Sequence, residues 1–491
     1  MATPIPPNEA HFSVSDLLTI TRGNLTSALG PEASVVGLTT DSRSVVPGNA
    51  FVAIRGEKLD GHGFLAMAAE RGARLVIVER GRPVPAKVSA IEVDSPLVAF
   101  GAIARAHVDR WRREHVGARI VAVTGSAGKT TTKELLAAIL GAIAPCLFTV
   151  GNLNNRVGVP NVALGFEHQR YGVFELGMSV PGEIAALAEI VRPDVAVLLN
   201  VGLAHAEGFG GSRDGIAREK GSIFEALPRD GVAVVNADDV LAYAQRSRTP
   251  ARCVRFGNSD GVDVRVVHRA PTSDGRSRVT IDRRGERFDV VLPLHGEAVA
   301  TDLAAAIAAA DAVLGQPAPP EVIAAAVAVW TPPSGRAVSY ALENGVVVLD
   351  DSYNANPASM RAAFATLGEL KNATRGRAIC VLGEMRELGP ISRREHAALG
   401  GELARHRFDL VVGCGGEINL ALQRAEQAGL AVRSCAGPEE AGELLVKEVR
   451  PGDVVLFKGS RGAEVERALA VLLARHPRGS APAASATRGV T

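Results

Sequence analysis

The sequence is poor in cysteine, and its cysteines are not paired in sequence. The chain of 491 residues contains five of them, none in a Cys-x-x-Cys spacing: Cys146, Cys253, Cys380, Cys414 and Cys435. An odd number at scattered positions argues against a disulfide framework and against a cysteine-built zinc site. Such usage is typical of the reducing cytoplasm, where we expect this protein to be located.

An excess of charge of either sign is also absent. Lys and Arg number 54 and Asp and Glu number 53, which leaves a net charge of +1. This balance gives no reason to expect a nucleic-acid or membrane-surface partner. Any anionic ligand must therefore be held by local groups.

Long hydrophobic runs are missing too. The longest apolar stretch, residues 303–315, is short, rich in alanine and interrupted by Asp311, which predicts a core helix and no membrane span. The first residues, MATPIPPNEAHF, show no basic region followed by an apolar one, so we expect no signal peptide.

The length exceeds that of a usual single domain and predicts two or three domains. Residues 1–95 contain short β-like runs and one helical stretch near 64–71, which predicts a small α/β unit. A central region over 96–331 ends at the breaker TPPSG, and a third region covers 332–476. The tail 477–491 is small and polar, and we expect it to be disordered.

The central region begins with an amphipathic pattern over 97–115 that predicts a helix. We expect strands and helices to follow at 120–123 (strand), 131–139 (helix), 172–175, 195–200 and 232–236 (strands), and an alanine-rich helix after Thr301. Thr301 or Asp302 is the predicted N-cap of that last helix.

The third region alternates between strand and helix patterns. Its predicted strands are 346–350, 378–382, 410–413 and 454–457, with a further short one between the last two. This alternation predicts a mostly parallel sheet with helices on both faces.

A glycine-rich segment, TGSAGKT, follows the first predicted strand of the central region and precedes a helix. Strand, glycine loop and helix in this order predict a phosphate-binding loop, in which backbone N–H groups and the helix N-terminus face phosphate oxygens. Lys129 supplies a charge for the β- and γ-phosphates, and the Thr130 hydroxyl can ligate Mg²⁺. Val123 stands where the general pattern has glycine, so this is a shorter variant. The predicted ATP-binding residues of the loop are Gly125, Ser126, Ala127, Gly128, Lys129, Thr130 and Thr131.

Further motifs accompany the loop along the chain. They read GNLNNRVGVP at 151–160, FELGMSVPGEI at 174–184, NVGLAHAEGFG at 200–210, AREKGSIFEALP at 217–228, DDSYNANP at 350–357, LGEMRELG at 382–389 and KGSR at 458–461. Together with TDSRSVVPGNAFVAIRGEKLDGHGF at 40–64, they resemble the Mur ligases of bacterial cell-wall synthesis, in order, from about residue 35 to 470.

The resemblance implies an α/β fold of three domains: a small N-terminal substrate domain, a central P-loop ATPase domain with a parallel sheet, and a C-terminal Rossmann-like domain. It also implies a monomer that uses ATP and Mg²⁺, with two ions expected. GNLNN, DDSYNANP and LGEMRELG are similar to the family member that adds D-alanyl-D-alanine to UDP-N-acetylmuramoyl-tripeptide through an acyl phosphate. No Asp-Asn-Pro-Arg signature, which marks the relative that adds a diamino acid, is present.

The resemblance also implies roles for charged residues of the central region. Lys129 and Mg²⁺ would stabilise the transferring phosphoryl group. Glu175, which ends a predicted strand, and His205 would join Thr130 as metal ligands. Lys220 matches a family lysine that is carbamylated, which converts a cation into an oxygen-donor anion.

In the third region, Arg336 resembles the arginine that reaches the ATP phosphates, a role that suits a guanidinium fork. Asp351 is expected to hold the ribose, so that nucleotide binding would draw the domains together. The expected D-alanyl-D-alanine residues are Asn354, Asn356, Lys458, Ser460 and Arg461. KGSR follows a strand and is expected to open a helix, where a carboxylate can bind. The expected UDP-substrate residues are Asp41, Ser42, Arg43, Asn152, Asn154 and Asn155.

The pattern breaks at the adenine end. Where the family usually carries a His-Asn or His-Gln pair and a further Asn, this chain has Ala298, Val299 and Asp302. Glu384 replaces a commoner Asp. Weaker ATP binding or looser base selectivity would follow. Two alternatives stay open: another Mur-type ligase that adds a single amino acid, and a nucleotide-binding regulatory relative that no longer catalyses ligation.

Overall fold

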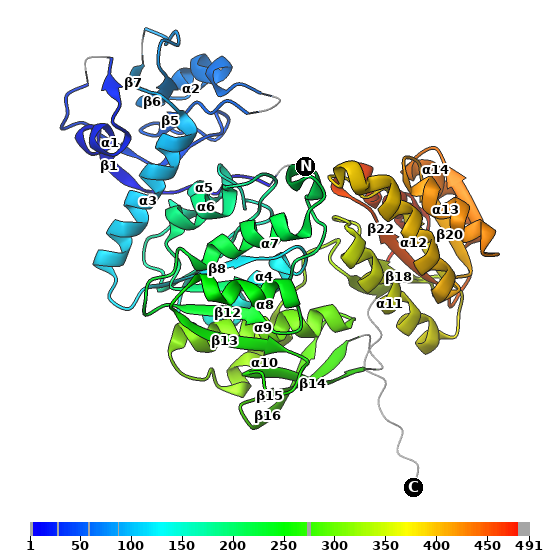
Figure 1. The fold of residues 1–491 in the computed structure, drawn as a ribbon. Coiled ribbons are helices and arrows are strands. Elements are labelled where there is room, and N and C mark those ends of the chain that lie inside the picture. Colours follow the sequence, from blue (N-terminus) through cyan, green and yellow to red (C-terminus); the bar gives the residue numbers. More distant parts are fainter. Residues whose placement is uncertain (1–2, 27–28, 57–58, 87, 273–275, 480–491) are drawn as a thin grey trace.

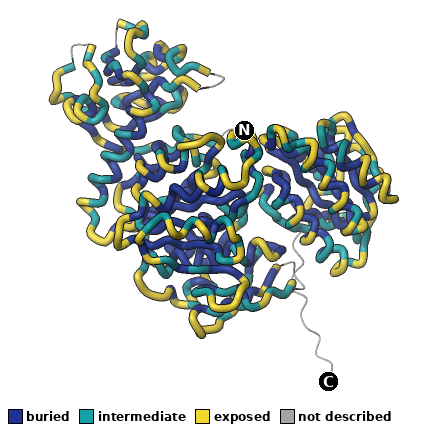
Figure 2. Tube along the Cα trace, viewed as in Figure 1, coloured by how far each residue is buried: buried dark blue, intermediate teal, exposed yellow. Residues whose placement is uncertain are grey.

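The computed structural model describes residues 3–26, 29–56, 59–86, 88–272 and 276–479. Three α/β units follow one another along the chain and lie side by side (Figure 1), the first at one end in blue and the last in yellow to red. Each unit has its own sheet, and the buried residues appear as dark blue trace in Figure 2. One buried core continues from the N-terminal unit into the central unit. The three-domain α/β architecture is confirmed, whereas the domain limits at 95/96 and 331/332 stay predictions.

The N-terminal unit is built on a five-stranded sheet with the order β2-β7-β6-β5-β4. Only β2 runs antiparallel to its neighbour. A separate pair is formed by β1 and β3. The bounds are β1 (His11–Ser13), α1 (Val14–Thr21), β2 (Asn24–Leu25), β3 (Ser34–Val36), β4 (Leu38–Thr39), β5 (Ala50–Val52), α2 (Leu65–Glu70), β6 (Leu75–Glu79) and β7 (Ser89–Val93).

A nine-stranded sheet forms the central unit, with the order β16-β15-β14-β13-β12-β11-β8-β10-β9. In sheet order, the strands β9, β10, β8, β11, β12, β13 and β14 pair in parallel. The strands β14, β15 and β16 form an antiparallel meander. The bounds are β8 (Arg119–Thr124), β9 (Cys146–Phe148), β10 (Tyr171–Glu175), β11 (Val195–Leu198), β12 (Val232–Asn236), β13 (Arg252–Gly257), β14 (Val264–Pro271), β15 (Ser277–Arg283) and β16 (Glu286–Leu292).

Helices cover both faces of this sheet. Ile120 and Ala122 of β8 belong to the core that includes α3, α5 and α6, whereas Val121 and Val123 belong to the core beneath α4, α9 and α10. A strand buried on both faces reads as a continuous apolar run, which is why β8 was predictable. The helices are α3 (Pro96–Glu114), α4 (Lys129–Gly141), α5 (Gly158–Ala163), α6 (Glu183–Val191), α7 (Arg213–Gly221), α8 (Val240–Ala244), α9 (Glu297–Leu314) and α10 (Pro320–Val329).

The C-terminal unit has a six-stranded sheet with the order β17-β18-β22-β19-β20-β21, and only β17 is antiparallel. Separate cores lie on its two faces, so the predicted parallel sheet with helices on both sides is confirmed. The bounds are β17 (Val338–Ala341), β18 (Val347–Asp350), α11 (Pro357–Thr374), β19 (Ala378–Leu382), α12 (Ser392–His406), β20 (Leu410–Cys414), α13 (Ile418–Gln427), β21 (Val432–Cys435), α14 (Pro438–Glu448), β22 (Val454–Lys458) and α15 (Glu466–Arg475).

Two predictions about chain segments are wrong. Helix α9 begins at Glu297 with Gly296 as its N-cap, so neither Thr301 nor Asp302 caps it. At the C-terminal end, Arg478 forms an antiparallel bridge with Leu342, and Gly479 donates a backbone hydrogen bond to Ala341 (3.0 Å). Residues 477–479 are therefore ordered, and the remainder of the predicted disordered tail lies outside the described residues. Among the helices that the structure describes, none is long and apolar enough to cross a membrane.

Candidate active site

A cleft of about 690 Å³ lies between the central and C-terminal units. It brings together most of the residues singled out in the sequence, although they come from both units. The predicted residues that line it are Ser126, Ala127, Gly128, Lys129, Thr130, Thr131, Asn152, Asn154, Asn155, Glu175, His205, Arg336, Asp351, Asn354, Asn356, Lys458 and Arg461. Gly125, Lys220 and Ser460 support this lining from behind, and Asp41, Ser42 and Arg43 lie elsewhere.

The phosphate loop connects the end of β8 to the start of α4, as predicted. Gly128 caps α4 with φ of 82°, a left-handed conformation that favours glycine. A Cβ atom at this position would lie 2.2 Å from Oδ1 of Asp302. Both the conformation and the close approach therefore require glycine here.

Asn200 holds the loop in shape from the neighbouring strand end. Its Oδ1 accepts hydrogen bonds from the backbone N–H groups of Ser126 (3.0 Å) and Ala127 (2.9 Å), and its Nδ2 donates to the Ala127 carbonyl (3.1 Å). Sequence reasoning did not assign this residue a role. Its position two residues after the buried strand β11, at the same sheet edge as the loop, was the available signal.

Two lysines converge behind the loop. The ammonium groups of Lys129 and Lys220 both donate to the Gly125 carbonyl, at 2.9 and 3.0 Å. Lys220 is completely buried at the end of α7. Burial, and then the charge of Lys129, lower the pKa of Lys220 well below its usual range, which favours the neutral amine.

Glu175 is a buried carboxylate at the end of β10, as predicted. It accepts hydrogen bonds from the Thr130 hydroxyl (2.9 Å) and from Asn154 Nδ2 (2.7 Å). Burial acts to raise its pKa, but the nearby cations, Lys129 first among them, outweigh this effect and hold the pKa below its usual value. An ionised carboxylate beside a threonine hydroxyl is a donor set that suits a hard cation such as Mg²⁺.

His205 has a partner across the cleft. Its Nδ1 forms an ion pair with Glu387, which belongs to the C-terminal unit, and this contact holds the pKa of Glu387 below its usual value. The backbone N–H of Glu207 also donates to the Glu387 carbonyl (3.0 Å). Glu387 was not predicted as a site residue. The described residues contain no cluster of three or more His, Cys, Asp or Glu arranged to hold a metal ion.

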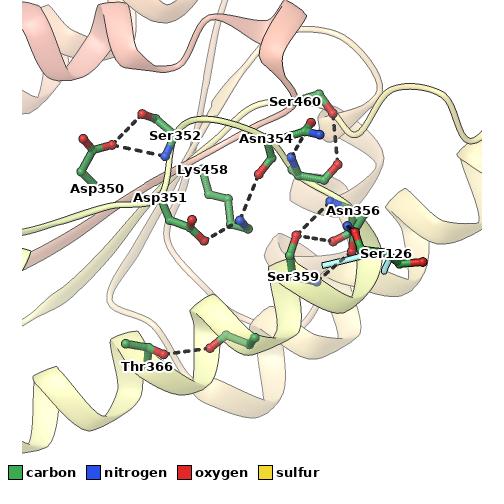
Figure 3. A network of polar contacts seen from close by, with 12 residues as sticks. Ser126, Asp350, Asp351, Ser352, Asn354, Asn356, Ser359, Thr366, Lys458 and Ser460 are labelled. Atoms are coloured by element: carbon green, nitrogen blue, oxygen red, sulfur yellow. Dashed lines mark hydrogen bonds and ion pairs between the residues drawn. The ribbon is translucent and has the colours of Figure 1, made fainter. Parts of the chain in front are cut away.

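The C-terminal unit contributes a polar network at the carboxyl ends of β18 and β22 (Figure 3). Lys458 Nζ donates to Asp351 Oδ2 (2.5 Å) and to the Asn354 carbonyl (3.1 Å), so two residues predicted to contact different substrates are bonded to each other. Burial raises the pKa of Asp351, and Lys458 offsets part of that rise.

Asn356 joins this network to the phosphate loop. It caps α11 by accepting a hydrogen bond from Ser359 N (2.9 Å), and its Nδ2 donates to the Ser126 carbonyl (3.2 Å). The contact is visible in Figure 3, where Ser126 meets the start of α11. The two units therefore meet directly at the phosphate end of the cleft.

The arginines of the C-terminal unit flank an aromatic ring. The guanidinium carbon of Arg336 lies 3.9 Å from the ring centroid of Tyr353, and that of Arg461 lies 5.7 Å from it. The expected helix start at KGSR is wrong, because Arg461–Ala463 is a single 3-10 turn and α15 begins at Glu466. Ser460 is buried, and its hydroxyl accepts a hydrogen bond from the backbone N–H of Arg386 (2.8 Å), so it links the segment after β22 to the segment after β19.

The residues predicted to bind the UDP substrate lie in two places. Asp41 and Arg43 pair with each other on the N-terminal unit, outside the cleft, and Arg43 lowers the pKa of Asp41. The asparagine loop, which carries Asn152, Asn154 and Asn155, lies in the cleft. Thr3 donates a hydrogen bond to Asn152 Oδ1 (2.7 Å). The structure therefore does not bring the two groups together.

The segment expected near adenine also lines the cleft. Ala298, Val299 and Asp302 lie on the first two turns of α9, facing the loop. Asp302 is 8 % exposed, and burial raises its pKa well above the usual value; the nearby Thr132 hydroxyl and the charge of Arg336 offset this only in part.

Comparisons with known proteins cover the same regions. The Mur ligase family catalytic domain matches residues 34–110, the Mur ligase middle domain matches 123–310, and the Mur ligase glutamate ligase domain matches 335–461. A relative from Escherichia coli K12, named UDP-N-acetylmuramoyl-tripeptide--D-alanyl-D-alanine ligase, is 35 % identical over 464 residues, which cover 93 % of this chain and 99 % of the relative.

Solved structures agree with these matches. MurF from Acinetobacter baumannii superposes with a TM-score of 0.85 at 32 % identity, covering 96 % of this chain and 100 % of that one. MurF ligase from Thermotoga maritima in complex with ADP superposes with a TM-score of 0.77 at 29 % identity, covering 89 % of this chain and 97 % of that one.

Proposed function

The chain belongs to the Mur ligase family, and we propose that it is the ATP-dependent ligase that joins D-alanyl-D-alanine to UDP-N-acetylmuramoyl-tripeptide. The observation that carries this function is the cleft, in which a phosphate loop and a buried carboxylate of the central unit face the polar network of the C-terminal unit. Similarity to relatives of the same activity extends over 93 % of the chain.

The reaction needs two steps in one cationic, sheltered site. The terminal carboxylate of the tripeptide attacks the γ-phosphorus of ATP, the bond to ADP breaks, and an acyl phosphate forms. The amine of D-alanyl-D-alanine then attacks the acyl carbon, phosphate leaves, and the amine loses a proton. Lys129 and Arg336 both line the cleft and would balance the charge of ATP and carboxylate.

We propose that Mg²⁺ binds at Thr130 and Glu175, with phosphate oxygens completing its shell, because this ion is often held by one or two carboxylates and substrate phosphates. A second ion would use His205. The ions supply charge for the transferring phosphoryl group. His205 would exchange its contact with Glu387 for the metal.

Lys220 is the proposed carbamylation site. A neutral amine adds to CO₂ to give a carbamate and a proton, and the buried environment that lowers the pKa of Lys220 favours that neutral form. The resulting anion would also remove the repulsion between two ammonium groups at the Gly125 carbonyl.

The remaining contacts are proposed from position. Asn354, Asn356, Lys458 and Arg461 line the side of the cleft from which the dipeptide would enter, with Ser460 behind them. The asparagine loop and the Asp41–Arg43 turn would hold the UDP substrate from the other two units. A cytoplasmic monomer is proposed as well, in keeping with five unpaired cysteines.

A coupled phosphate assay across matched acceptors and donors tests the function. We expect release of phosphate only when ATP, UDP-N-acetylmuramoyl-tripeptide and D-alanyl-D-alanine are all present. Turnover with a free amino acid, and none with the dipeptide, would instead identify a single-residue ligase. Absence of phosphate release with every pair, in a protein that still binds ATP, would indicate a regulatory relative.

A further inference from the structure

Arg269 is a buried cation of β14 that lies outside the cleft. Its side chain is 4 % exposed. The guanidinium donates to Glu297 Oε1 through Nε (2.9 Å), to Glu369 Oε1 through Nη2 (2.6 Å) and to Ser277 Oγ through Nη1 (3.3 Å). Burial alone would lower the pKa of Arg269, and the two glutamates more than offset this, so the side chain stays charged.

The two carboxylates come from different units. Glu297 is the first residue of α9 and belongs to the central unit, whereas Glu369 lies on α11 of the C-terminal unit. Glu369 Oε2 has no hydrogen-bond partner within the described part of the chain. The bond from Arg269 to its other oxygen is therefore the main attachment of this carboxylate.

Helix α11 forms a wall of the cleft. Ala358, Ala362 and Thr366 line the cavity from one face of the helix. Thr366 approaches the N-cap of α9 so closely that a Cβ atom on Gly296 would lie 2.6 Å from its hydroxyl oxygen. This end of the wall therefore abuts the segment that carries Ala298 and Val299.

The wall is attached to the central unit at two places. Asn356, at its start, bonds to the Ser126 carbonyl in the phosphate loop. Glu369 bonds to Arg269 on the meander. Glu369 lies 13 positions after Asn356, which corresponds to roughly 20 Å of helix and separates the phosphate end of the cleft from the far end.

We propose that Arg269 is a positioning residue that holds the C-terminal unit closed over the base end of the nucleotide by binding Glu369. The inference rests on the proposed function only in that the cleft binds ATP. Arginine is required because its planar guanidinium donates hydrogen bonds in three directions, to Glu297, Glu369 and Ser277. A lysine ammonium does not reproduce this geometry.

The expected effect follows from a closing equilibrium. If the attachment through Glu369 is weakened by loss of its charge, a smaller fraction of the protein is closed, and the apparent affinity for ATP falls by that fraction. Glu369→Gln should therefore raise KM for ATP about fivefold with less than a twofold change in kcat. Arg269→Lys should do the same or more.

Two variants in the central unit serve as controls. Glu297→Gln weakens the contact within the central unit to the same degree and leaves the contact between units, so KM for ATP should change less than twofold. Arg278 pairs with Asp289 inside the meander, and Arg278→Gln should leave KM and kcat unchanged.

Hydrogen exchange gives a readout independent of turnover. In the nucleotide-free protein, the backbone amides of residues 358–366 should exchange faster in Glu369→Gln than in wild type. In Arg278→Gln, they should exchange at the wild-type rate. Unaltered exchange and an unaltered KM for ATP in folded Glu369→Gln would overturn the proposal. A lower melting temperature with no change in exchange or KM would overturn it as well. A wild-type protein inactive with the dipeptide would refute the proposed function, and the exchange result would still stand.

Discussion

Lys129 and Lys220 donate hydrogen bonds to one and the same acceptor, the carbonyl oxygen of Gly125, at 2.9 and 3.0 Å. Two ammonium groups at such a separation repel, and both lie in a buried environment. Burial lowers the pKa of Lys129 as well, but the charge of Glu175 opposes that change. The arrangement is consistent with different proposed roles: Lys129 as the cation at the phosphates, and Lys220 as the amine more easily converted to its neutral form.

Replacing Lys129 with alanine should abolish turnover. The side chain is the cation of the loop, and its loss should lower kcat by at least about a thousandfold in the phosphate-release assay, as removal of a preorganised charge at a transferring group does. Lys447→Ala, at an exposed lysine of α14, should be fully active. Near-normal activity of Lys129→Ala would show that the loop does not bind the reacting phosphates.

Lys220→Ala should be slow and partly rescuable. Removal of the amine removes the proposed site of carbamylation, and kcat should fall by about a hundredfold. A short carboxylate such as acetate or formate can enter the vacated space and restore part of the activity, measured as phosphate release against added salt. Lys129→Ala should show no such rescue. Full activity of Lys220→Ala without any additive would count against carbamylation.

Asn200→Ala should weaken ATP binding. Its amide makes three hydrogen bonds to the backbone of Ser126 and Ala127, and each such bond contributes about 1 kcal/mol to holding the loop in shape. KM for ATP should rise about tenfold or more. Asn200→Asp keeps the acceptors but loses the donor and adds charge, and we expect an intermediate value. An unchanged KM in both variants would show that the loop keeps its shape unaided.

Asp302→Asn should change the pH dependence of stability. Because burial holds the pKa of Asp302 well above the usual 3.8, the folded state binds the proton more tightly than the unfolded chain does. Below the pKa that Asp302 has in the unfolded chain, the carboxyl is protonated in both states and its burial costs no ionisation energy. As the pH rises through the pKa in the folded state, the wild type loses stability because the buried carboxyl must ionise. The Asp302→Asn variant should therefore have a higher urea midpoint for the central unit than the wild type, and this difference should grow as the pH rises above the usual pKa of 3.8.

An exposed aspartate provides the comparison for this measurement. Asp230→Asn, on the surface of the same unit, should give a difference from wild type that does not grow with pH. A difference for Asp302→Asn that stays constant across the range would contradict the burial argument.

The parts predicted from sequence are those determined by local patterns. Strand β8, the glycine loop and α4 follow one another without interruption, and the apolar runs of the parallel strands show burial on both faces. Lys129 was predicted from the glycine-loop motif, and Glu175 from its place at the end of a predicted strand together with the family resemblance. These features need no knowledge of distant contacts.

The parts missed depend on contacts across the fold. Asn200 and Glu387 acquire their partners only when separate strands and units meet. The capping rule failed at α9 because Gly296 begins that helix without a side-chain cap, and Asp302, five residues after Glu297, turns toward Gly128. A residue type favourable for capping was thus used for packing against the loop.

The chain end also shields an edge of the C-terminal sheet. Strand β17 is the outermost strand, and residues 477–479 pair beyond it through the Leu342–Arg478 bridge, while the Arg478 guanidinium lies 3.7 Å from the ring centroid of Tyr340. A protein ending at Arg475 would expose these backbone groups to other molecules, since unpaired edges promote aggregation. One ending after Gly479 would keep the cover, so the solubility of shortened variants depends on residues 476–479.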